Sequence, residues 1–152
     1  PSSDRVKAVR GLSRRSARRR TGRLLVEGPQ GVREAVRFAP GSVVDLYVTA
    51  EAADRYGEIV DAARAAQRFV HEVTDEVLAA MCDADHPQGM AAVVEWEPTS
   101  FDTVLAAGPR TLVFLTNVRD PGNLGTVIRG ADAAGADAVL TYWATELAGW
   151  LR

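Results

Sequence analysis

Four polar side chains with the chemistry to bind a ligand lie within thirteen residues of one another, at Asn117, Asp120, Asn123 and Arg129. The amides can donate and accept hydrogen bonds, the carboxylate can accept them from backbone amides, and the planar guanidinium can bind a phosphate through two parallel hydrogen bonds. Binding groups are often carried on loops that a rigid scaffold positions, so this grouping predicts a ligand site. A capped turn followed by a surface arginine would use the same residues, and spacing alone leaves both interpretations open.

The surrounding sequence predicts one β-α-β unit to position these side chains. Residues 111–116 are a short uncharged run typical of a buried strand, and residues 120–123 have the composition of a turn. A helix is expected from Asn123 or Leu124 onward, before a second strand over residues 136–141. The expected apolar face of that helix consists of Val127, Ile128, Ala131 and Ala134. Open α/β sheets bind ligands at the carboxyl ends of their strands, which is where the polar residues fall.

The grouping belongs to a longer motif, Asn117-x-x-Asp-Pro-x-Asn-x-Gly-x-x-x-Arg129-x-Ala131. This motif resembles the first signature of the SpoU family, the ribose 2′-O-methyltransferases of the SPOUT superfamily. The match of several residue types at fixed spacing is far more specific than a lone glycine motif. The resemblance implies methyl transfer from S-adenosylmethionine to the ribose of RNA, with 23S-type ribosomal RNA favoured. It also implies a homodimer, because the family forms its active site across two subunits.

The resemblance assigns Arg129 and Asn117 to catalysis and Asn123 to contact with RNA. Arginine has a pKa above about 12, which makes it a poor general base. We therefore expect Arg129 to bind the phosphate at the target nucleotide and to orient or polarise the 2′-hydroxyl. Asn117 and Asn123 are expected to hold the turn and to contact RNA or the partner subunit.

Two further signature motifs of the SpoU family are absent from this sequence. In the family they form a C-terminal trefoil knot that binds S-adenosylmethionine. We therefore expect a truncated methyltransferase domain and a chain that, alone, is inactive and cannot bind the methyl donor, so we assign it no cofactor-binding residue. A cut chain, an altered reading frame, or the ordered part of a longer protein would each explain the missing motifs.

Basic residues are concentrated at the start of the chain, although the net charge is only −2. Residues 1–23 hold nine of the 18 basic residues and one acidic residue, Asp4, and all the basic residues except Lys7 are arginine. A clustered basic stripe is the usual electrostatic footprint of nucleic-acid binding, so RNA contact is favoured over a solvated basic helix. The candidate RNA-binding arginines are Arg14, Arg15, Arg18, Arg19, Arg20 and Arg23.

Residues 1–98 alternate short strands with helices, which predicts a small three-layer α/β/α domain. Strands are expected at 23–27, 42–49, 69–73 and 90–96, and helices at 4–10, 29–38, 51–66 and 74–81. Within the second strand, Val44, Leu46 and Val48 are expected to share one face. The weak periodicity of residues 14–20 leaves open whether they extend the first helix or form a loop.

Two segments of this domain are similar to the N-terminal RNA-binding domain of the SpoU family. Residues 24–28 resemble the segment that opens that domain, and residues 86–94 resemble the segment that closes it. Gln88, in the second segment, is a further candidate for RNA contact. The expected fold class is therefore α/β: an RNA-binding domain at residues 1–98, followed at residues 99–152 by the first part of a SPOUT-type, normally knotted methyltransferase domain.

The remaining residues indicate no second catalytic group, disulfide, membrane span or metal site. Glu27 lies between a strand and a Gly-Pro turn, and we expect it to contact a helix N-terminus or an arginine rather than to act in catalysis. The single Cys82 excludes an internal disulfide and fits a reducing compartment, so a cytoplasmic location is expected. No apolar run is long enough to cross a membrane, and His71, His86 and Cys82 lack the spacing of metal ligands. The alternatives to a ribosomal RNA methyltransferase are a tRNA 2′-O-methyltransferase and a non-catalytic RNA-binding protein.

Overall fold

The computed structural model describes residues 3–84, 87–97, 99–118 and 120–142. Contacts between residues divide the chain into two units, Pro1–Glu97 and Pro98–Arg152. Within the described ranges, no helix is both long enough and apolar enough to cross a membrane.

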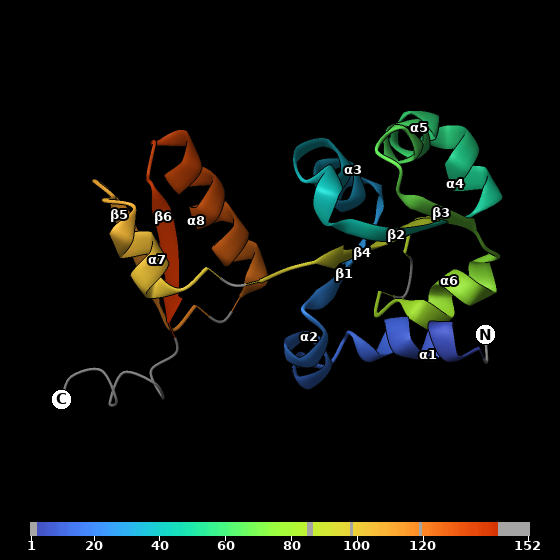
Figure 1. Cartoon of the computed structure of the whole chain (residues 1–152), viewed down its shortest axis with the longest axis horizontal. Coiled ribbons are helices and arrows are strands. Elements are labelled where there is room, and N and C mark those ends of the chain that lie inside the picture. Colours follow the sequence, from blue (N-terminus) through green and yellow to red (C-terminus); the bar gives the residue numbers. More distant parts are fainter. Residues whose placement is uncertain (1–2, 85–86, 98, 119, 143–152) are drawn as a thin grey trace. The chain divides into compact units, whose positions relative to one another are not determined.

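A mixed four-stranded sheet forms the middle layer of the first unit (Figure 1). In chain order the elements of this unit are α1 (Asp4–Gly11), α2 (Arg15–Thr21), β1 (Arg23–Glu27), α3 (Pro29–Phe38), the 3-10 turn η1 (Pro40–Ser42), β2 (Val43–Val48), α4 (Ala50–Arg55), α5 (Gly57–Ala65), β3 (Phe69–Glu72), α6 (Asp75–Met81) and β4 (Met90–Glu95). The strand order is β1-β4-β2-β3, with β4 antiparallel to both neighbours and β3 parallel to β2. Helices α3, α4 and α5 lie on one face and α1 and α6 on the other, so the predicted three-layer arrangement is confirmed.

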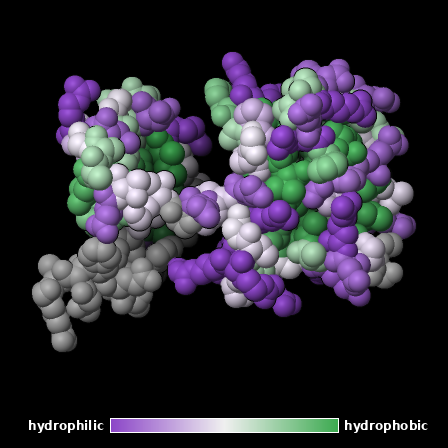
Figure 2. All heavy atoms as spheres, in the orientation of Figure 1, coloured by the Kyte–Doolittle hydropathy of each residue, from purple (hydrophilic) through white to green (hydrophobic). Residues whose placement is uncertain are grey.

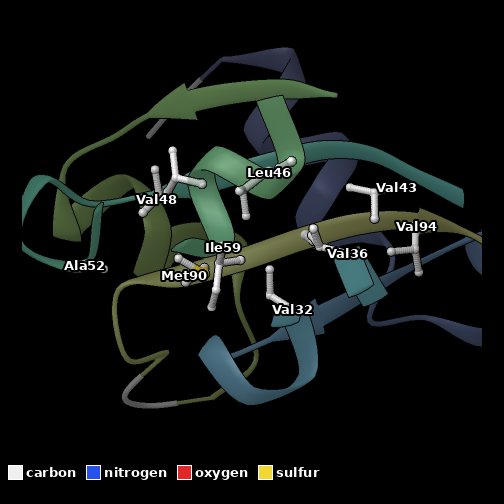
Figure 3. Close-up of a cluster of buried hydrophobic side chains, with 12 residues drawn as sticks. Val32, Val36, Val43, Leu46, Val48, Ala52, Ile59, Met90 and Val94 are labelled. Carbon is white, nitrogen blue, oxygen red and sulfur yellow. The ribbon is translucent and has the colours of Figure 1, made fainter. Parts of the chain in front are cut away.

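Two apolar layers hold these helices on the sheet. On one face, Val32 and Val36 of α3 and Ile59 of α5 pack with Leu46 and Met90 of the strands (Figure 3). The layer on the opposite face consists of Val6, Val9, Leu12, Tyr47, Leu78, Met81, Cys82, Ala91 and Val93. Burying an aliphatic side chain of this size contributes roughly 1.5–3 kcal/mol, so the first unit has a sizeable core of its own.

The helix expected over residues 51–66 is wrong, because the segment forms two helices, α4 and α5. Tyr56 leaves the helical conformation at φ −121° and ψ 40°, and Gly57, a poor helix former, follows it. The break allows Ala52 of the first helix and Ile59 of the second to reach the same core cluster.

The predicted alternation along β2 is also partly wrong. The pairing of β2 with β4 shifts between Val43 and Asp45, which is the mark of a β-bulge. Because the bulge adds a residue, Val43 joins the cluster of Leu46 and Val48, whereas Val44 packs on the opposite face.

The second unit contains the predicted β-α-β arrangement. Its elements are α7 (Phe101–Ala106), β5 (Leu112–Thr116), α8 (Pro121–Ala133) and β6 (Ala138–Tyr142). Strands β5 and β6 pair in parallel, with Leu112 opposite Ala138 and Leu115 opposite Thr141. Helix α8 connects them and begins earlier than predicted, because Asp120 caps it and the following proline suits the first helical position.

Burial in the second unit is lower than predicted. Along β5 exposed residues alternate with half-buried ones, and Leu112 and Phe114 are 37% and 54% exposed. On α8 Ala131 is buried, but Ile128 is 44% exposed and Ala134 is also exposed. A strand is fully buried only when both faces of its sheet are covered, and the described helices leave part of this surface open. Figure 2 shows hydrophobic atoms at the surface of this unit.

Candidate functional site

The turn between β5 and α8 carries the predicted polar residues in a defined backbone geometry. Asn117 directly follows β5 and has φ 56°, a left-handed conformation that asparagine tolerates better than most residues. Asp120 caps α8, and its Oδ1 accepts a 2.8 Å hydrogen bond from the Gly122 amide. Asn123 lies in the first turn of the helix and is exposed. Asn117, Asp120 and Asn123 therefore all lie in this turn or in the first turn of α8.

Arg129 is exposed on the same helix, and its guanidinium lies close to the helix surface. Its Nη2 donates a 3.2 Å hydrogen bond to Thr126 Oγ1, and a Cβ atom added at Gly125 would lie 3.3 Å from its Nη1. Helical side chains lean toward the N-terminus of their helix. The guanidinium therefore lies toward the turn that holds Asp120 and Asn123.

A carboxylate closes the opposite end of the two strands. Asp137, just before β6, accepts hydrogen bonds from the backbone amides of Thr111 at 2.9 Å and Arg110 at 2.8 Å. These two bonds lower the pKa of the Asp137 carboxyl. Asp137 thus ties the start of β5 to the start of β6, and the turn that leads into α8 lies at the other end of β5.

Residues 14–20, for which the sequence did not distinguish a helix from a loop, lie mostly in the separate helix α2. The arginines of this segment and Arg23 fall into two groups. Arg14, Arg15, Arg19 and Arg20 are exposed, and within the described part of the chain they form no ion pair. By contrast, Arg18 Nη1 donates to the carbonyl oxygens of Leu12 at 2.9 Å and Ser13 at 2.5 Å. Arg23 forms a 3.4 Å ion pair with Glu95 across β1 and β4. Arg18 and Arg23 therefore bind other groups of the first unit, whereas the other four arginines present their charge to solvent.

Gln88 stands at the rim between two hollows of the first unit. It is exposed and has φ 52°, and Gly89 beside it has φ 74°. One hollow, of about 730 Å³, lies between α4, α6 and this loop. The other, of about 240 Å³, lies against Glu27 and the start of α3. A left-handed conformation at a residue other than glycine costs free energy, and such residues are frequent at binding sites.

Glu27 has a structural role, as predicted, but through different partners. Its Oε1 and Oε2 accept hydrogen bonds from the backbone amides of Asp83 at 2.8 Å and Ala84 at 2.9 Å. The sequence predicted that Glu27 contacts a helix N-terminus or an arginine. The two amides instead follow the end of α6, 56 and 57 residues along the chain from Glu27. Burial raises the pKa of the neighbouring Cys82 thiol to about 12, and the charges of Glu27 and Asp83 add to the rise.

Replacing Glu27 by alanine should destabilise the first unit by about 1–2 kcal/mol, because two backbone amides lose a charged acceptor. Chemical unfolding followed by circular dichroism would measure the change. Glu72→Ala, at an exposed glutamate of β3, is the matched control and should change stability by less than about 0.5 kcal/mol. Equal stability of the Glu27→Ala variant and the control would show that Glu27 does not anchor the loop.

The polar groups elsewhere in the first unit do not form a cluster of metal ligands among the described residues. His71 Nε2 lies 2.7 Å from Asp45 Oδ1, and the imidazole stacks on Tyr47 with ring centroids 5.2 Å apart. His86, which was considered with it, lies outside the described residues.

Thr126 is the residue of this site that sequence reasoning missed. Its hydroxyl donates a 3.0 Å hydrogen bond to the Gly122 carbonyl and accepts one from Arg129. The available signal was its spacing, four residues after Gly122 and three before Arg129, which places all three along one side of a helix.

Comparison with known proteins finds RNA methyltransferases among the relatives of this chain. Over 121 residues the chain is 37% identical to the 23S rRNA (guanosine-2′-O-)-methyltransferase RlmB of Bordetella pertussis, covering 76% of this chain and 49% of that protein. It is 32% identical to the 23S rRNA (guanosine(2553)-2′-O)-methyltransferase RlmP of Bacillus subtilis, covering 91% and 51%. A solved AdoMet-bound rRNA methyltransferase from Sinorhizobium meliloti matches with a TM-score of 0.70 and 29% identity, over 92% of this chain and 51% of that one.

The chain spans about half the length of the curated relatives that it matches. These relatives confirm the resemblance to SpoU-type methyltransferases. The family model of the MRM3-like substrate binding domain matches residues 3–92, which is most of the first unit. The chain therefore belongs, through its first unit, to the family of MRM3-like substrate binding domains.

Proposed function

We propose that the complete protein is an S-adenosylmethionine-dependent RNA ribose 2′-O-methyltransferase and that ribosomal RNA of the 23S type is its substrate. The observation that carries the proposal is the turn after β5, where Asp120 caps α8 and Arg129 leans back along the same helix. In support, RlmB and RlmP, which the chain resembles over three quarters or more of its length, are 23S rRNA 2′-O-methyltransferases by name.

The reaction requires that the 2′-oxygen of the ribose attack the methyl carbon of a sulfonium. A C–O bond forms, the C–S bond breaks with its electron pair moving to sulfur, and the hydroxyl proton passes to water. Alignment of the two reacting groups is the main requirement, since correct placement can lower a barrier by roughly 7–11 kcal/mol. An arginine that fixes the phosphate of the target nucleotide meets this requirement directly.

Arg129 performs this task in the proposed mechanism. A guanidinium stays protonated, so it serves as a clamp and an electrostatic partner of the 2′-oxygen rather than as a base. Of its five N–H donors, the hydrogen bond to Thr126 uses one, and the rest can bind phosphate. Asn117 and Asn123 contact the RNA backbone or a second subunit from the turn.

The described residues do not enclose a methyl donor. Leu112, Phe114 and Arg129 are exposed, and the second unit has two paired strands within the described ranges. We assign none of these residues to S-adenosylmethionine, which supplies the methyl group when it is bound.

The first unit binds the RNA substrate in this proposal, and residues 99–152 begin the methyltransferase domain. Arg14, Arg15, Arg19 and Arg20 hold phosphates, because they are exposed and unpaired within the described residues. Gln88 contacts a base or ribose, since its amide can both donate and accept hydrogen bonds. Arg18 and Arg23 contribute charge to the same surface while bound to their own carbonyl and carboxylate partners.

We further propose that the protein acts as a homodimer in the cytoplasm. The support for the homodimer is the apolar surface of the second unit, where Phe101, Leu105, Leu112, Phe114 and Ile128 are each at least 37% exposed. Apolar surface of this kind is usually covered by another part of the protein or by a second subunit. The support for the cytoplasm is the single cysteine, Cys82, which fits a reducing compartment.

The experiment that tests the proposed function is transfer of a labelled methyl group from S-adenosylmethionine by the complete protein. Protein-free ribosomal RNA and transfer RNA transcripts are offered separately, and the labelled nucleotide is mapped. We expect a 2′-O-methylated ribose in ribosomal RNA. Label in transfer RNA alone would show that transfer RNA, and not ribosomal RNA, is the substrate. RNA binding without methyl transfer would identify a non-catalytic RNA-binding protein.

A further inference from the structure

We infer that Thr126 is a positioning residue that sets the direction of the Arg129 guanidinium. The inference rests on the proposed function, because it assigns Thr126 a part in the reaction only if Arg129 orients the ribose. Three contacts on α8 carry it: Asp120 to Gly122, Gly122 to Thr126, and Thr126 to Arg129.

The contacts form an unbroken chain from the turn to the guanidinium. Asp120 Oδ1 accepts from the Gly122 amide at 2.8 Å, and the Gly122 carbonyl accepts from Thr126 Oγ1 at 3.0 Å. The same Oγ1 then accepts from Arg129 Nη2 at 3.2 Å. Because the Thr126 hydroxyl has a single proton, donating it to Gly122 leaves its lone pairs for Arg129. The position of the guanidinium is therefore coupled to the geometry of the turn.

The bond to Gly122 also fixes the side chain of Thr126 itself. A threonine in a helix divides between two χ1 rotamers, and a hydrogen bond from Oγ1 to a carbonyl one turn earlier selects one of them. Serine could make the same bond with less restraint, and valine has the same shape but no hydroxyl. These two residues therefore separate the hydrogen bond from the packing of the side chain.

Gly125 provides the space in which the guanidinium lies. A Cβ atom at this position would approach Arg129 Nη1 to 3.3 Å, which is tighter than most real contacts. Glycine inside a helix is unfavourable relative to alanine, so its presence here calls for a local reason. The hydrogen bond to Thr126 holds a long, flexible side chain against α8, beside Gly125, with its remaining donors available to an anion.

The test uses the complete protein with the variants Thr126→Val and Thr126→Ser. For Thr126→Val we expect kcat for RNA methylation to fall by about three- to tenfold, with KM for RNA changed by less than about twofold, because an exposed charge-assisted hydrogen bond is lost. Thr126→Ser should restore kcat to within about twofold of wild type, since it keeps the hydroxyl. NMR relaxation of the Arg129 Nε–Hε group should show greater mobility in Thr126→Val than in wild type.

Thr21→Val is the matched control, because Thr21 Oγ1 makes the same type of bond, to the Ala17 carbonyl at 2.8 Å, on α2. It should leave kcat and the mobility of Arg129 unchanged. The positioning role would be overturned if Thr126→Val left the mobility of Arg129 unaltered, or if it altered that mobility and kept the wild-type kcat. In either case methyl transfer by the wild-type protein would still support the proposed function. A wild-type protein that transfers no methyl group to RNA would instead overturn the proposed function and the positioning role together.

Discussion

Replacing Arg129 by alanine should reduce methyl transfer to RNA by at least about 10²–10³-fold, the loss typical of removing a donor that orients or stabilises the reacting oxygen. The folded state should be almost unaffected, because Arg129 is exposed and its described contacts are the hydrogen bond to Thr126 and the approach to Gly125. Exposed substitutions usually change stability by less than about 0.5 kcal/mol. Initial rates of labelled methyl transfer, together with thermal unfolding, would measure both effects.

Two further variants show whether this loss is specific to the guanidinium of Arg129. Arg129→Lys keeps the charge but loses the planar fork, so we expect an activity between those of wild type and Arg129→Ala. Arg110→Ala removes another exposed arginine, at the other end of β5, and keeps the backbone amide that Arg110 donates to Asp137. It should retain wild-type activity. Wild-type rates for Arg129→Ala, or equal losses in Arg110→Ala, would refute the assignment of Arg129.

The turn between β5 and α8 was predictable because its interactions are local. Asp120 caps α8 by accepting a hydrogen bond from the amide of Gly122, only two residues away. The strands before and after α8 are apolar runs of ordinary length. The order strand, turn, helix, strand follows from these signals alone. The predicted start of α8, at Asn123 or Leu124, was too late, because Pro121 suits the first turn of a helix as well as it suits a turn.

The contacts that join distant segments were not predictable from the sequence. Glu27 finds its two amides 56 and 57 residues away, and no local pattern indicates that meeting. Arg18 looks like its neighbours in the sequence, yet it is the one whose guanidinium reaches back to the end of α1. Whether an arginine binds RNA or its own backbone depends on the direction in which the helix turns it.

The predicted burial of β5 failed for another physical reason. An uncharged run signals that a strand will be covered somewhere, but it does not say by which segment. Phe114 is 54% exposed in a unit whose described residues cover the sheet only partly. The apolar residues of β5 therefore predict the strand but not the segment that covers it.

Replacing Arg15, Arg19 and Arg20 by glutamine should weaken binding of the complete protein to ribosomal RNA by roughly 10–100-fold at low salt. All three are exposed on α2, and Arg15 and Arg19 are one turn apart. Like charges at this spacing repel one another, so their cluster is destabilising unless an anion lies against it. Glutamine keeps the helix propensity of arginine, which isolates the effect of charge.

The dependence of this binding on salt distinguishes phosphate contacts from a general loss of charge. Each phosphate contact releases counterions, so loss of three contacts should reduce the slope of log affinity against log salt by about 2 for single-stranded RNA. Filter binding over a salt series would measure the slope. The matched control replaces Arg37, Arg64 and Arg110, which are exposed on α3, on α5 and just before β5, by glutamine and removes the same total charge. If both triple variants lose affinity equally, the arginines of α2 do not form a specific RNA surface. A loss confined to the α2 variant would locate the RNA against α2.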